Sequence, residues 1–318
     1  MSEIFLHHYP NSPFAEKVRL VLGYKNLAWK SVIIPDISPK PDLTALTGGY
    51  RKTPVMQVGS DIYCDTALIC DVLEHLHPVP SLYPAVHKGL ARIIAQWADE
   101  KVFWAAMAYN LGPKGSAQVL GRGRAPEVWM PEAKVFAEDR NKMRMGAPRL
   151  PGADATAAYK SYLRRISTLL EDQEFVMGDA PCLADFSVYH PLWFTRRVSS
   201  VMVGILDATP AVLHWMDRME AFGHGRKTDS NAAESIASCG QGGWGNSIFG
   251  QEKFQDEHGI ELGSEVTVAA ESFGLETTRG TLVSATRTYY TLRRTDERAG
   301  VVQVHFPRIG YILKKADV

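Results

Sequence analysis

A serine at the start of a helix is the residue of this sequence best placed to do chemistry. Residues 4–6 form an apolar run, a turn follows at residues 9–11, and Ser12 and Pro13 then precede an apolar stripe with helical spacing. Serine is favoured at a helix N-cap, and proline is tolerated in the first turn. We therefore expect Ser12 to present its hydroxyl at the positive end of a helix, where a thiolate or another anion is stabilised. The plain alternative is that Ser12 only caps the helix.

The elements that must position Ser12 form a mixed α/β unit over residues 1–80. After the first helix the sequence predicts strands at residues 29–34, 55–58 and 62–64 and a helix at residues 65–76. The order is βαβ, a hairpin and a helix, which is the order of the thioredoxin fold.

The rest of the chain changes character twice. Residues 87–225 repeat apolar residues with a 3.6-residue period, which predicts an all-helical bundle. Residues 226–258 are rich in Gly, Ser, Asn and Gln and read as a linker or an irregular ordered connection. Residues 259–318 contain five short alternating runs separated by turn signals, which predict a small all-β domain, an SH3-like barrel.

Composition limits the possible partners. The chain has 318 residues, of which 45% are hydrophobic and 22% are charged, and its 35 basic and 35 acidic residues cancel. No basic excess is available for phosphates, which argues against nucleic acid, and no apolar run reaches the roughly 20 residues of a membrane helix. The start of the chain lacks a signal-peptide pattern. The four cysteines lack metal-ligand or CxxC spacing, so we expect reduced thiols, no metal and a cytoplasmic protein.

Four sequence blocks resemble the glutathione transferase superfamily over residues 1 to about 225. They are Ser12-Pro13-Phe14-Ala15, Lys52-Thr53-Pro54-Val55, Asp65-Thr66 and Gly178-Asp179-Ala180-Pro181-Cys182-Leu183-Ala184-Asp185. The first block is similar to the omega class and its glutaredoxin-like relatives, in which a cysteine stands at the position of Ser12. In the last block Cys182 fills the position of a Ser or Thr helix cap, and Asp185 can still complete a capping box.

This resemblance implies a glutathione site and a soluble homodimer. Thr66 and the helix N–H groups would meet the γ-glutamyl carboxylate, and Asp65 its ammonium. A cis Pro54 would expose the backbone of Thr53 to the cysteinyl part, and Lys40 would meet the glycyl carboxylate. The resemblance also implies that Asp99 reaches the partner subunit's glutathione. The alternatives are a simple helix cap for Asp65-Thr66 and a solvent-exposed lysine for Lys40. The residues implied to bind glutathione are Phe14, Lys40, Lys52, Thr53, Pro54, Asp65 and Thr66.

Serine in place of cysteine changes the expected reaction. A cysteine can form a mixed disulfide with glutathione, whereas Ser12 can only donate a hydrogen bond to its thiolate. We therefore expect conjugation, ether cleavage or isomerisation of a hydrophobic electrophile rather than thiol transfer. The pocket for this second substrate is expected between the first two domains, from residues that are otherwise core or surface residues. Its candidates are Tyr9, Pro10, Trp104, Tyr109, Trp193 and Arg196.

A second function remains open because of the C-terminal strands. Arginines alternate there with aromatic residues, which is a pattern of RNA binding, but nearby Glu and Asp residues interrupt the basic patch, so a packing or partner-binding module is favoured. The alternative to a transferase is therefore a non-catalytic binding protein that keeps the transferase scaffold and recruits a partner through residues 259–318.

Overall fold

The computed structural model describes residues 3–144, 150–241, 253–255 and 257–316. Its first unit has the thioredoxin-like order that the sequence predicts, with a short extra helix, α2. Strands β1 and β2 are parallel, whereas β3 pairs antiparallel with both β1 and β4. The elements are β1 (Ile4–His8), α1 (Pro13–Tyr24), β2 (Ala28–Ile33), α2 (Pro41–Thr47), β3 (Val55–Val58), β4 (Asp61–Cys64) and α3 (Thr66–Leu76).

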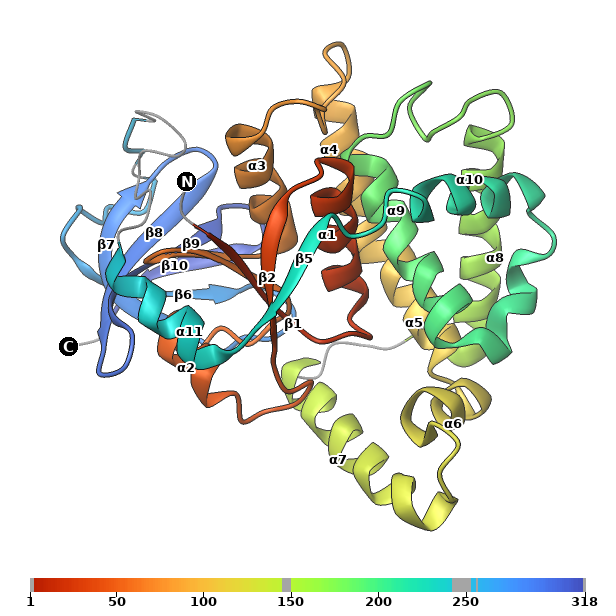
Figure 1. Ribbon diagram of the computed structural model, residues 1–318, viewed down its shortest axis with the longest axis horizontal. Helices are drawn as coiled ribbons and strands as arrows, with labels where there is room; N and C mark the ends of the chain where they lie inside the picture. The colour runs from red at the N-terminus through yellow and green to blue at the C-terminus, as the bar shows by residue number, and fades with distance from the viewer. Residues whose placement is uncertain (1–2, 145–149, 242–252, 256, 317–318) are drawn as a thin grey trace.

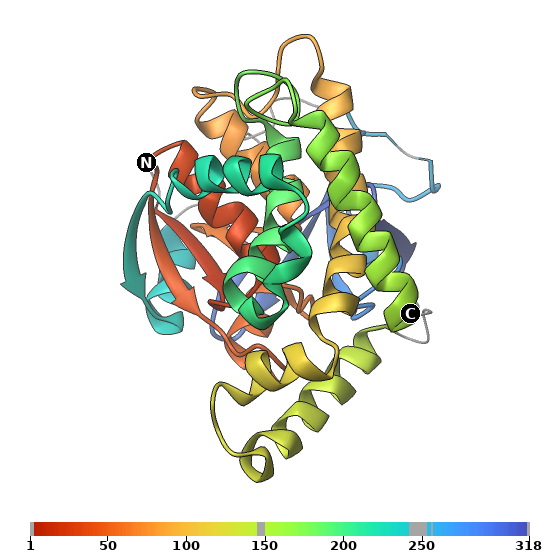
Figure 2. The same ribbon diagram turned by 90° about the vertical axis from the view of Figure 1, so that its right-hand side faces the viewer.

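The second unit is helical, as predicted, and packs beside α1 and α3 (Figure 1). Its helices are α4 (Lys88–Trp97), α5 (Phe103–Asn110), α6 (Pro113–Gly121), α7 (Pro126–Arg144), α8 (Gly152–Leu169), α9 (Leu183–Trp193) and α10 (Pro210–Glu220). One π turn, η1 (Ala98–Val102), joins α4 to α5, another, η2 (Phe194–Val198), extends α9, and a 3₁₀ segment, η3 (Ser200–Leu206), follows. Helices α6 and α7 extend away from the other helices in both views (Figure 2).

The capping box that the sequence predicts at the start of α9 is present. The backbone N–H of Cys182 donates to Oδ2 of Asp185 at 2.9 Å, and the Cys182 side chain caps the helix in return. Oδ1 of Asp185 also accepts from the N–H of Val176 at 2.8 Å and from Nε1 of Trp215 at 2.9 Å. One buried carboxylate thus holds α9, α10 and the preceding loop together.

Within the described residues, all strands join one ten-stranded sheet in the order β10-β6-β7-β8-β9-β4-β3-β1-β2-β5. The late strands are β5 (Arg226–Ser230), β6 (Glu265–Ala270), β7 (Thr278–Ala285), β8 (Tyr289–Asp296), β9 (Gly300–Pro307) and β10 (Tyr311–Lys315). The C-terminal strands attach through β9, which runs parallel to β4 and pairs Ile62 with Val304. At this junction Nε2 of His305 contacts Oδ1 of Asp61 at 2.8 Å.

Residues 226–241 of the predicted linker form regular secondary structure. Strand β5 adds to the edge of the sheet parallel to β2, and α11 (Ala232–Ala237) and the 3₁₀ turn η4 (Ser238–Gln241) follow. A linker was the wrong interpretation of this segment, because an edge strand faces water and can be as polar as a loop. Residues 242–252, the Gly-rich part of the predicted linker, and residue 256 lie outside the described residues.

The C-terminal strands share a core with the thioredoxin-like unit. One cluster of buried side chains combines Leu46 and Ile62 of the first unit with Val266, Leu292 and Phe306 of the late strands. The all-β region predicted at residues 259–318 is therefore confirmed as strands, but it does not bury its core alone. The SH3-like barrel and the domain boundaries at 80, 87, 225 and 259 stay predictions.

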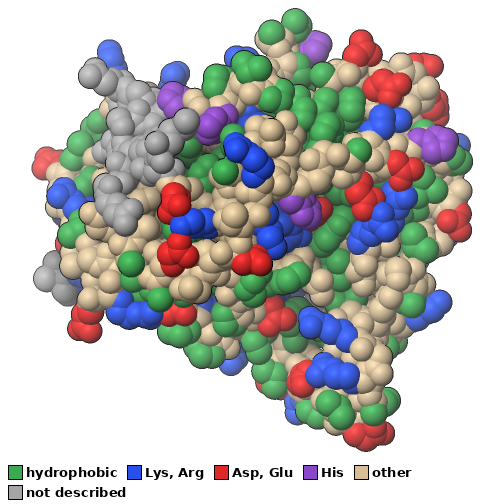
Figure 3. Space-filling model, in the orientation of Figure 1, with side chains coloured by type: hydrophobic (Ala, Val, Ile, Leu, Met, Phe, Trp, Pro, Cys, Tyr) green, Lys and Arg blue, Asp and Glu red, His purple; other side chains and the backbone are tan. Residues whose placement is uncertain are grey.

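Three further findings bear on the composition argument. All four cysteines are free and buried. Among the described residues, no helix is both long and apolar enough to cross a membrane. Figure 3 shows acidic and basic side chains interspersed on the visible face of the protein.

Candidate functional site

Ser12 occupies the N-cap of α1, as the sequence predicts. Its backbone is extended, with φ −76° and ψ 117°, and its Oγ accepts a hydrogen bond from the N–H of Ala15 at 3.2 Å. The bond from Ala15 does not use the Ser12 hydroxyl proton, for which the Tyr9 phenol is a side-chain hydrogen-bond partner. Only 2% of Ser12 is exposed, and its own N–H donates to the carbonyl of Tyr9 at 3.1 Å. Burial raises the pKa of the Tyr9 phenol, so this ring stays neutral beside Ser12.

The segment before β3 has the backbone that the resemblance implies. The Thr53–Pro54 peptide bond is cis. Nζ of Lys40 donates to Oγ1 of Thr53 and to the carbonyl of Arg51, both at 3.2 Å. Lys40 is buried, with 6% exposed, and this burial, with the charges of Arg140 and Arg51 nearby, lowers its pKa to about 8. Lys40 is thus a buried cation rather than a surface lysine.

Asp65 and Thr66 lie next to each other at the start of α3. Asp65 has a positive φ of 76°, and its Oδ1 accepts from the N–H of Ala67 at 2.9 Å. Oγ1 of Thr66 accepts from Nζ of Lys17 at 3.2 Å, which leaves the Thr66 hydroxyl proton free to donate. Asp65 therefore caps the helix, and both residues keep polar capacity for a ligand.

Lys17 is a residue of this site that the sequence reasoning missed. Its side chain is fully buried, and Nζ forms an ion pair with Oδ2 of Asp99 at 2.6 Å. Oδ1 of Asp99 contacts Nε2 of His190 at 2.9 Å. Asp99 is thus engaged within its own chain, and the expectation that it reaches a partner subunit's glutathione stays a prediction. A lysine on the otherwise apolar face of α1 was the available signal.

Aromatic side chains connect the site to the helical unit. The ring centroid of Phe14 lies 4.6 Å from those of Phe103 and His190. Trp104 packs at 4.9 Å from Phe103 and at 5.0 Å from Phe273, which lies between β6 and β7. Of the residues predicted to bind the second substrate, Trp104 thus lies along the wall that begins with Phe14.

The other predicted second-substrate residues have separate contacts. Tyr9 is half-buried under Nζ of Lys40, which lies 5.7 Å from its ring, and Pro10 is exposed. The Tyr109 hydroxyl donates to the carbonyl of Met202 at 3.0 Å inside the helical unit. The Arg19 guanidinium lies 5.7 Å from the Trp193 ring centroid, and Arg196 pairs with Asp217 at 2.6 Å. The structure does not bring Tyr109 and Arg196 to Ser12.

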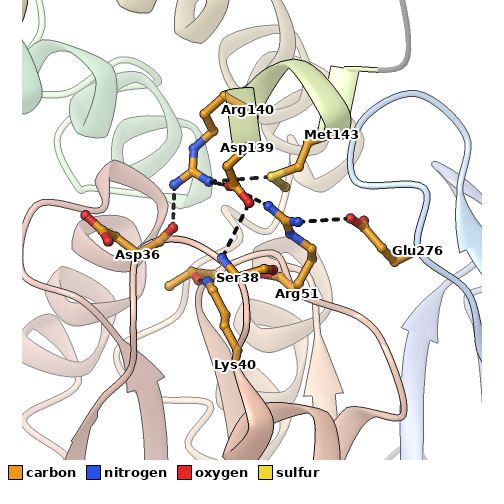
Figure 4. Close-up of polar contacts among 9 residues, drawn as sticks. Asp36, Ser38, Lys40, Arg51, Asp139, Arg140, Met143 and Glu276 are labelled. Atoms are coloured by element: carbon orange, nitrogen blue, oxygen red, sulfur yellow. Dashed lines mark hydrogen bonds and ion pairs between the residues drawn. The ribbon is translucent and has the colours of Figure 1, made fainter. Parts of the chain in front are cut away.

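A polar cluster joins three parts of the chain beside Lys40 (Figure 4). Oδ2 of Asp139, on α7, contacts the guanidinium groups of Arg51 at 2.5 Å and Arg140 at 2.6 Å. Arg140 also donates to the carbonyl of Asp36 at 2.6 Å, and Arg51 pairs with Glu276 at 3.2 Å.

A cavity of about 490 Å³ adjoins this cluster, between the region of α2 and the late strands. It is lined by Lys40, Arg51, Glu276, Asp296 and Arg298, among others. Its walls therefore carry charges of both signs.

Lys52 also lies where the first unit meets the late strands. Its Nζ is 4.8 Å from the ring centroid of Tyr311 and 5.6 Å from that of Tyr50, and burial lowers its pKa. Among the described residues, no group of three or more His, Cys, Asp or Glu side chains is arranged to hold a metal ion. The site is thus built from hydroxyls, carboxylates, lysines and aromatic rings.

Comparison with known proteins supports this interpretation of the geometry. The family model "Glutathione S-transferase, N-terminal domain" matches residues 6–81, and "Glutathione S-transferase, C-terminal domain" matches residues 132–218. A GST-like protein from Pseudomonas syringae of known crystal structure is 38% identical, with a TM-score of 0.76, and the match covers 99% of this chain and 100% of that one.

Two curated proteins match parts of the chain. FtsZ-localized protein A of Caulobacter vibrioides is 25% identical over 189 residues, which are 57% of this chain and 72% of the relative. Pyrimidodiazepine synthase of Drosophila melanogaster is 30% identical over 76 residues, 23% of this chain and 31% of the relative. From the two family models and the full-length match to the Pseudomonas protein, we conclude that the chain belongs to the glutathione transferase superfamily.

Proposed function

We propose that this protein is a glutathione-dependent transferase in which the Ser12 hydroxyl stabilises the glutathione thiolate for attack on a hydrophobic electrophile. The observation that carries the proposal is the position of Ser12. Its Oγ accepts from a backbone N–H at the start of α1, and its proton, which has the Tyr9 phenol as a partner, turns to the sulfur of a bound ligand. The proposal extends to a cytoplasmic homodimer. It also includes an SH3-like barrel formed by the C-terminal strands. The pairing of the last strand, β10, with the first of these strands, β6, supports this part of the proposal.

The energy available at Ser12 matches what the chemistry requires. Lowering the pKa of a thiol from about 8.5 by about two units requires roughly 2.7 kcal/mol in favour of the anion. A hydrogen bond to a charged sulfur contributes about 1.5–3 kcal/mol. The helix N-terminus adds about 0.3–1 kcal/mol. No general base is needed for this shift.

The remaining groups suit the other parts of glutathione. Asp65 takes the γ-glutamyl ammonium, and Thr66 with the N–H groups of α3 takes the carboxylate. The Thr53 backbone, before the cis peptide bond, pairs with the cysteinyl residue, and Lys40 takes the glycyl carboxylate. The electrophile is assigned to the aromatic wall that contains Trp104. The other members of the proposed glutathione site are Phe14, Lys52 and Pro54.

One observation favours a second candidate function. Ser12 is only 2% exposed, so a thiolate has little access to its hydroxyl without movement of the neighbouring side chains. The match to the relative named FtsZ-localized protein A covers 72% of that protein's length. The second candidate is a non-catalytic binding protein that recruits a partner through its C-terminal strands.

The experiment that decides between them measures turnover of glutathione with a panel of aryl halides, aryl ethers and epoxides. For Ser12→Ala we expect kcat/KM to fall about 10- to 100-fold, as for loss of a hydrogen bond to a charged group. The pKa of bound glutathione, read from thiolate ultraviolet absorbance, should rise. Ser12→Thr keeps both the hydroxyl and the helix cap and should stay active.

The control for loss of a buried hydroxyl is Ser187→Ala, since Ser187 is fully buried in α9. Loss of the cap alone should lower the stability of Ser12→Ala by about 1 kcal/mol. Unchanged turnover and thiolate pKa in Ser12→Ala would overturn the role of Ser12. Wild-type protein that binds glutathione but turns over no member of the panel would support the second candidate.

A further inference from the structure

The last strand of the protein reaches the start of α3. Tyr311 is the first residue of β10 and pairs with Ala270 of β6. Its hydroxyl donates to Oδ2 of Asp65 at 3.0 Å and lies 3.3 Å from the Tyr50 hydroxyl. Asp65 and Tyr311 are 246 residues apart in sequence. A side chain from outside both matched family domains thus contacts the carboxylate assigned to the γ-glutamyl ammonium.

The two phenols keep their protons in this setting. Burial, followed by the negative charge of Asp65, raises the pKa of Tyr50 and of Tyr311 well above the ordinary value. Tyr311 has one proton, and the ionised carboxylate is the stronger acceptor, so Tyr311 donates to Asp65. The Tyr50 oxygen is the second acceptor within reach of the same Tyr311 proton, at 3.3 Å. Tyr311 is thus the donor of this cluster, and Asp65 and Tyr50 are its two acceptors.

The position of the Tyr311 ring is fixed on several sides. Its centroid lies 5.5 Å from that of Phe306 and 6.3 Å from that of Tyr50. Nζ of Lys52 lies 4.8 Å from the same centroid, a cation–π contact. Only 6% of Tyr311 is exposed. The hydroxyl is therefore held in place by its packing before any ligand arrives.

Asp65 retains capacity for a ligand after these contacts. Its Oδ1 accepts from the N–H of Ala67 and its Oδ2 from Tyr311, whereas an ionised carboxylate can accept about four hydrogen bonds. Asp65 is also half-exposed, unlike the two tyrosines. Tyr311 thus orients the carboxylate without using all of its acceptor sites.

The loop between β6 and β7 approaches the site from another direction. The N–H of Gly274 donates to the carbonyl of Met143 at 2.8 Å, at the end of α7. Gly274 has a φ of +69°, and a side chain there would meet Cγ of Lys52 at 3.1 Å. Together with Phe273 against Trp104, these contacts make the C-terminal strands one wall of the proposed site.

From these contacts we propose that Tyr311 is a positioning residue of the glutathione site, which orients Asp65 toward the γ-glutamyl ammonium. The C-terminal strands are then a part of the binding site rather than a separate recruitment module. This inference rests on the proposed function, because it assumes that glutathione is the ligand.

The test measures the Kd of two ligands by isothermal titration calorimetry. The first is S-methylglutathione, and the second is its deamino analogue, in which a glutaryl group replaces the γ-glutamyl group. Tyr311→Phe removes the hydroxyl and keeps the ring. We expect its Kd for S-methylglutathione to rise roughly fivefold, the size of a typical lost hydrogen bond, with the Kd for the deamino analogue unchanged.

The matched control is Tyr290→Phe, which removes a buried hydroxyl of the same strands whose partner is Nε of Arg308 at 3.2 Å. It should change neither Kd. An equal loss of affinity for both ligands in Tyr311→Phe would show a merely structural role and overturn the inference, as would no change for either ligand. Wild-type protein that binds neither ligand would overturn the proposed function itself, and the inference with it.

Discussion

Because Lys40 is buried, we predict that the affinity for glutathione depends on pH between 7 and 9, a range in which an ordinary lysine stays charged. Its pKa is lowered to about 8, first by burial and then by the charges of Arg140 and Arg51. The charged form is the one that attracts a carboxylate. Ligand binding is therefore linked to proton uptake by Lys40, so affinity should fall as the pH rises from 7 to 9.

The size of this effect follows from the pKa. A lysine with a pKa of about 8 is about nine-tenths charged at pH 7 and about one-tenth charged at pH 9. The population of the binding-competent form thus falls about tenfold, which sets the expected increase in Kd if only charged Lys40 binds the glycyl carboxylate. An ordinary exposed lysine, with a pKa of about 10.4, would lose only a few per cent of its charge over the same range.

The assay is calorimetric titration of S-methylglutathione at pH 7, 8 and 9, because the blocked sulfur does not titrate. The control variant is Lys40→Arg, whose guanidinium stays charged throughout, so its Kd should change little apart from the contribution of the ligand's own amino group. That contribution is common to both proteins and cancels in the comparison. Equal pH dependence in wild type and Lys40→Arg would refute the assignment of Lys40 to the glycyl carboxylate.

Two further predictions concern stability. Burial lowers the pKa of His7 to about 4, so its contribution to stability is complete above the unfolded pKa of about 6.5 and is lost as the pH falls toward 4. Urea unfolding at pH 5 should show a loss of about 2 kcal/mol from this residue. An unchanged pH dependence of stability in His7→Gln would contradict this prediction. Asp185→Ala leaves the buried N–H groups of Val176, Cys182 and Trp215 without their acceptor. In the same assay it should lower the free energy of unfolding by about 3–5 kcal/mol. A loss below about 1 kcal/mol would refute the role of the capping box.

Much of the site was predictable because it is built at helix starts. Ser12, Asp65 and Cys182 each take a cap position that depends on a few neighbouring residues, and all three caps are present. The cis bond before Pro54 came from the family resemblance rather than from local preference, since most X–Pro bonds are trans. Lys17 was not predicted because lysine is usually a surface residue, and the partner that allows its burial, Asp99, lies 82 residues away in the sequence.

The sequence by itself determined the type of each main unit and the family to which the chain belongs. Helical periodicity and strand alternation are local patterns, so they can be recognised without knowledge of tertiary contacts. Only the tertiary structure decided which strands meet. Strand β5 joins β2 and β9 joins β4, although no local pattern names a partner for either strand.

That choice of partners also changes the site. It turns the predicted separate C-terminal domain into an extension of the thioredoxin-like sheet, and it delivers Tyr311 to Asp65. The physical reason is that strand pairing satisfies backbone hydrogen bonds that every residue type carries, so side-chain pattern specifies a strand but leaves its neighbour to be selected by packing.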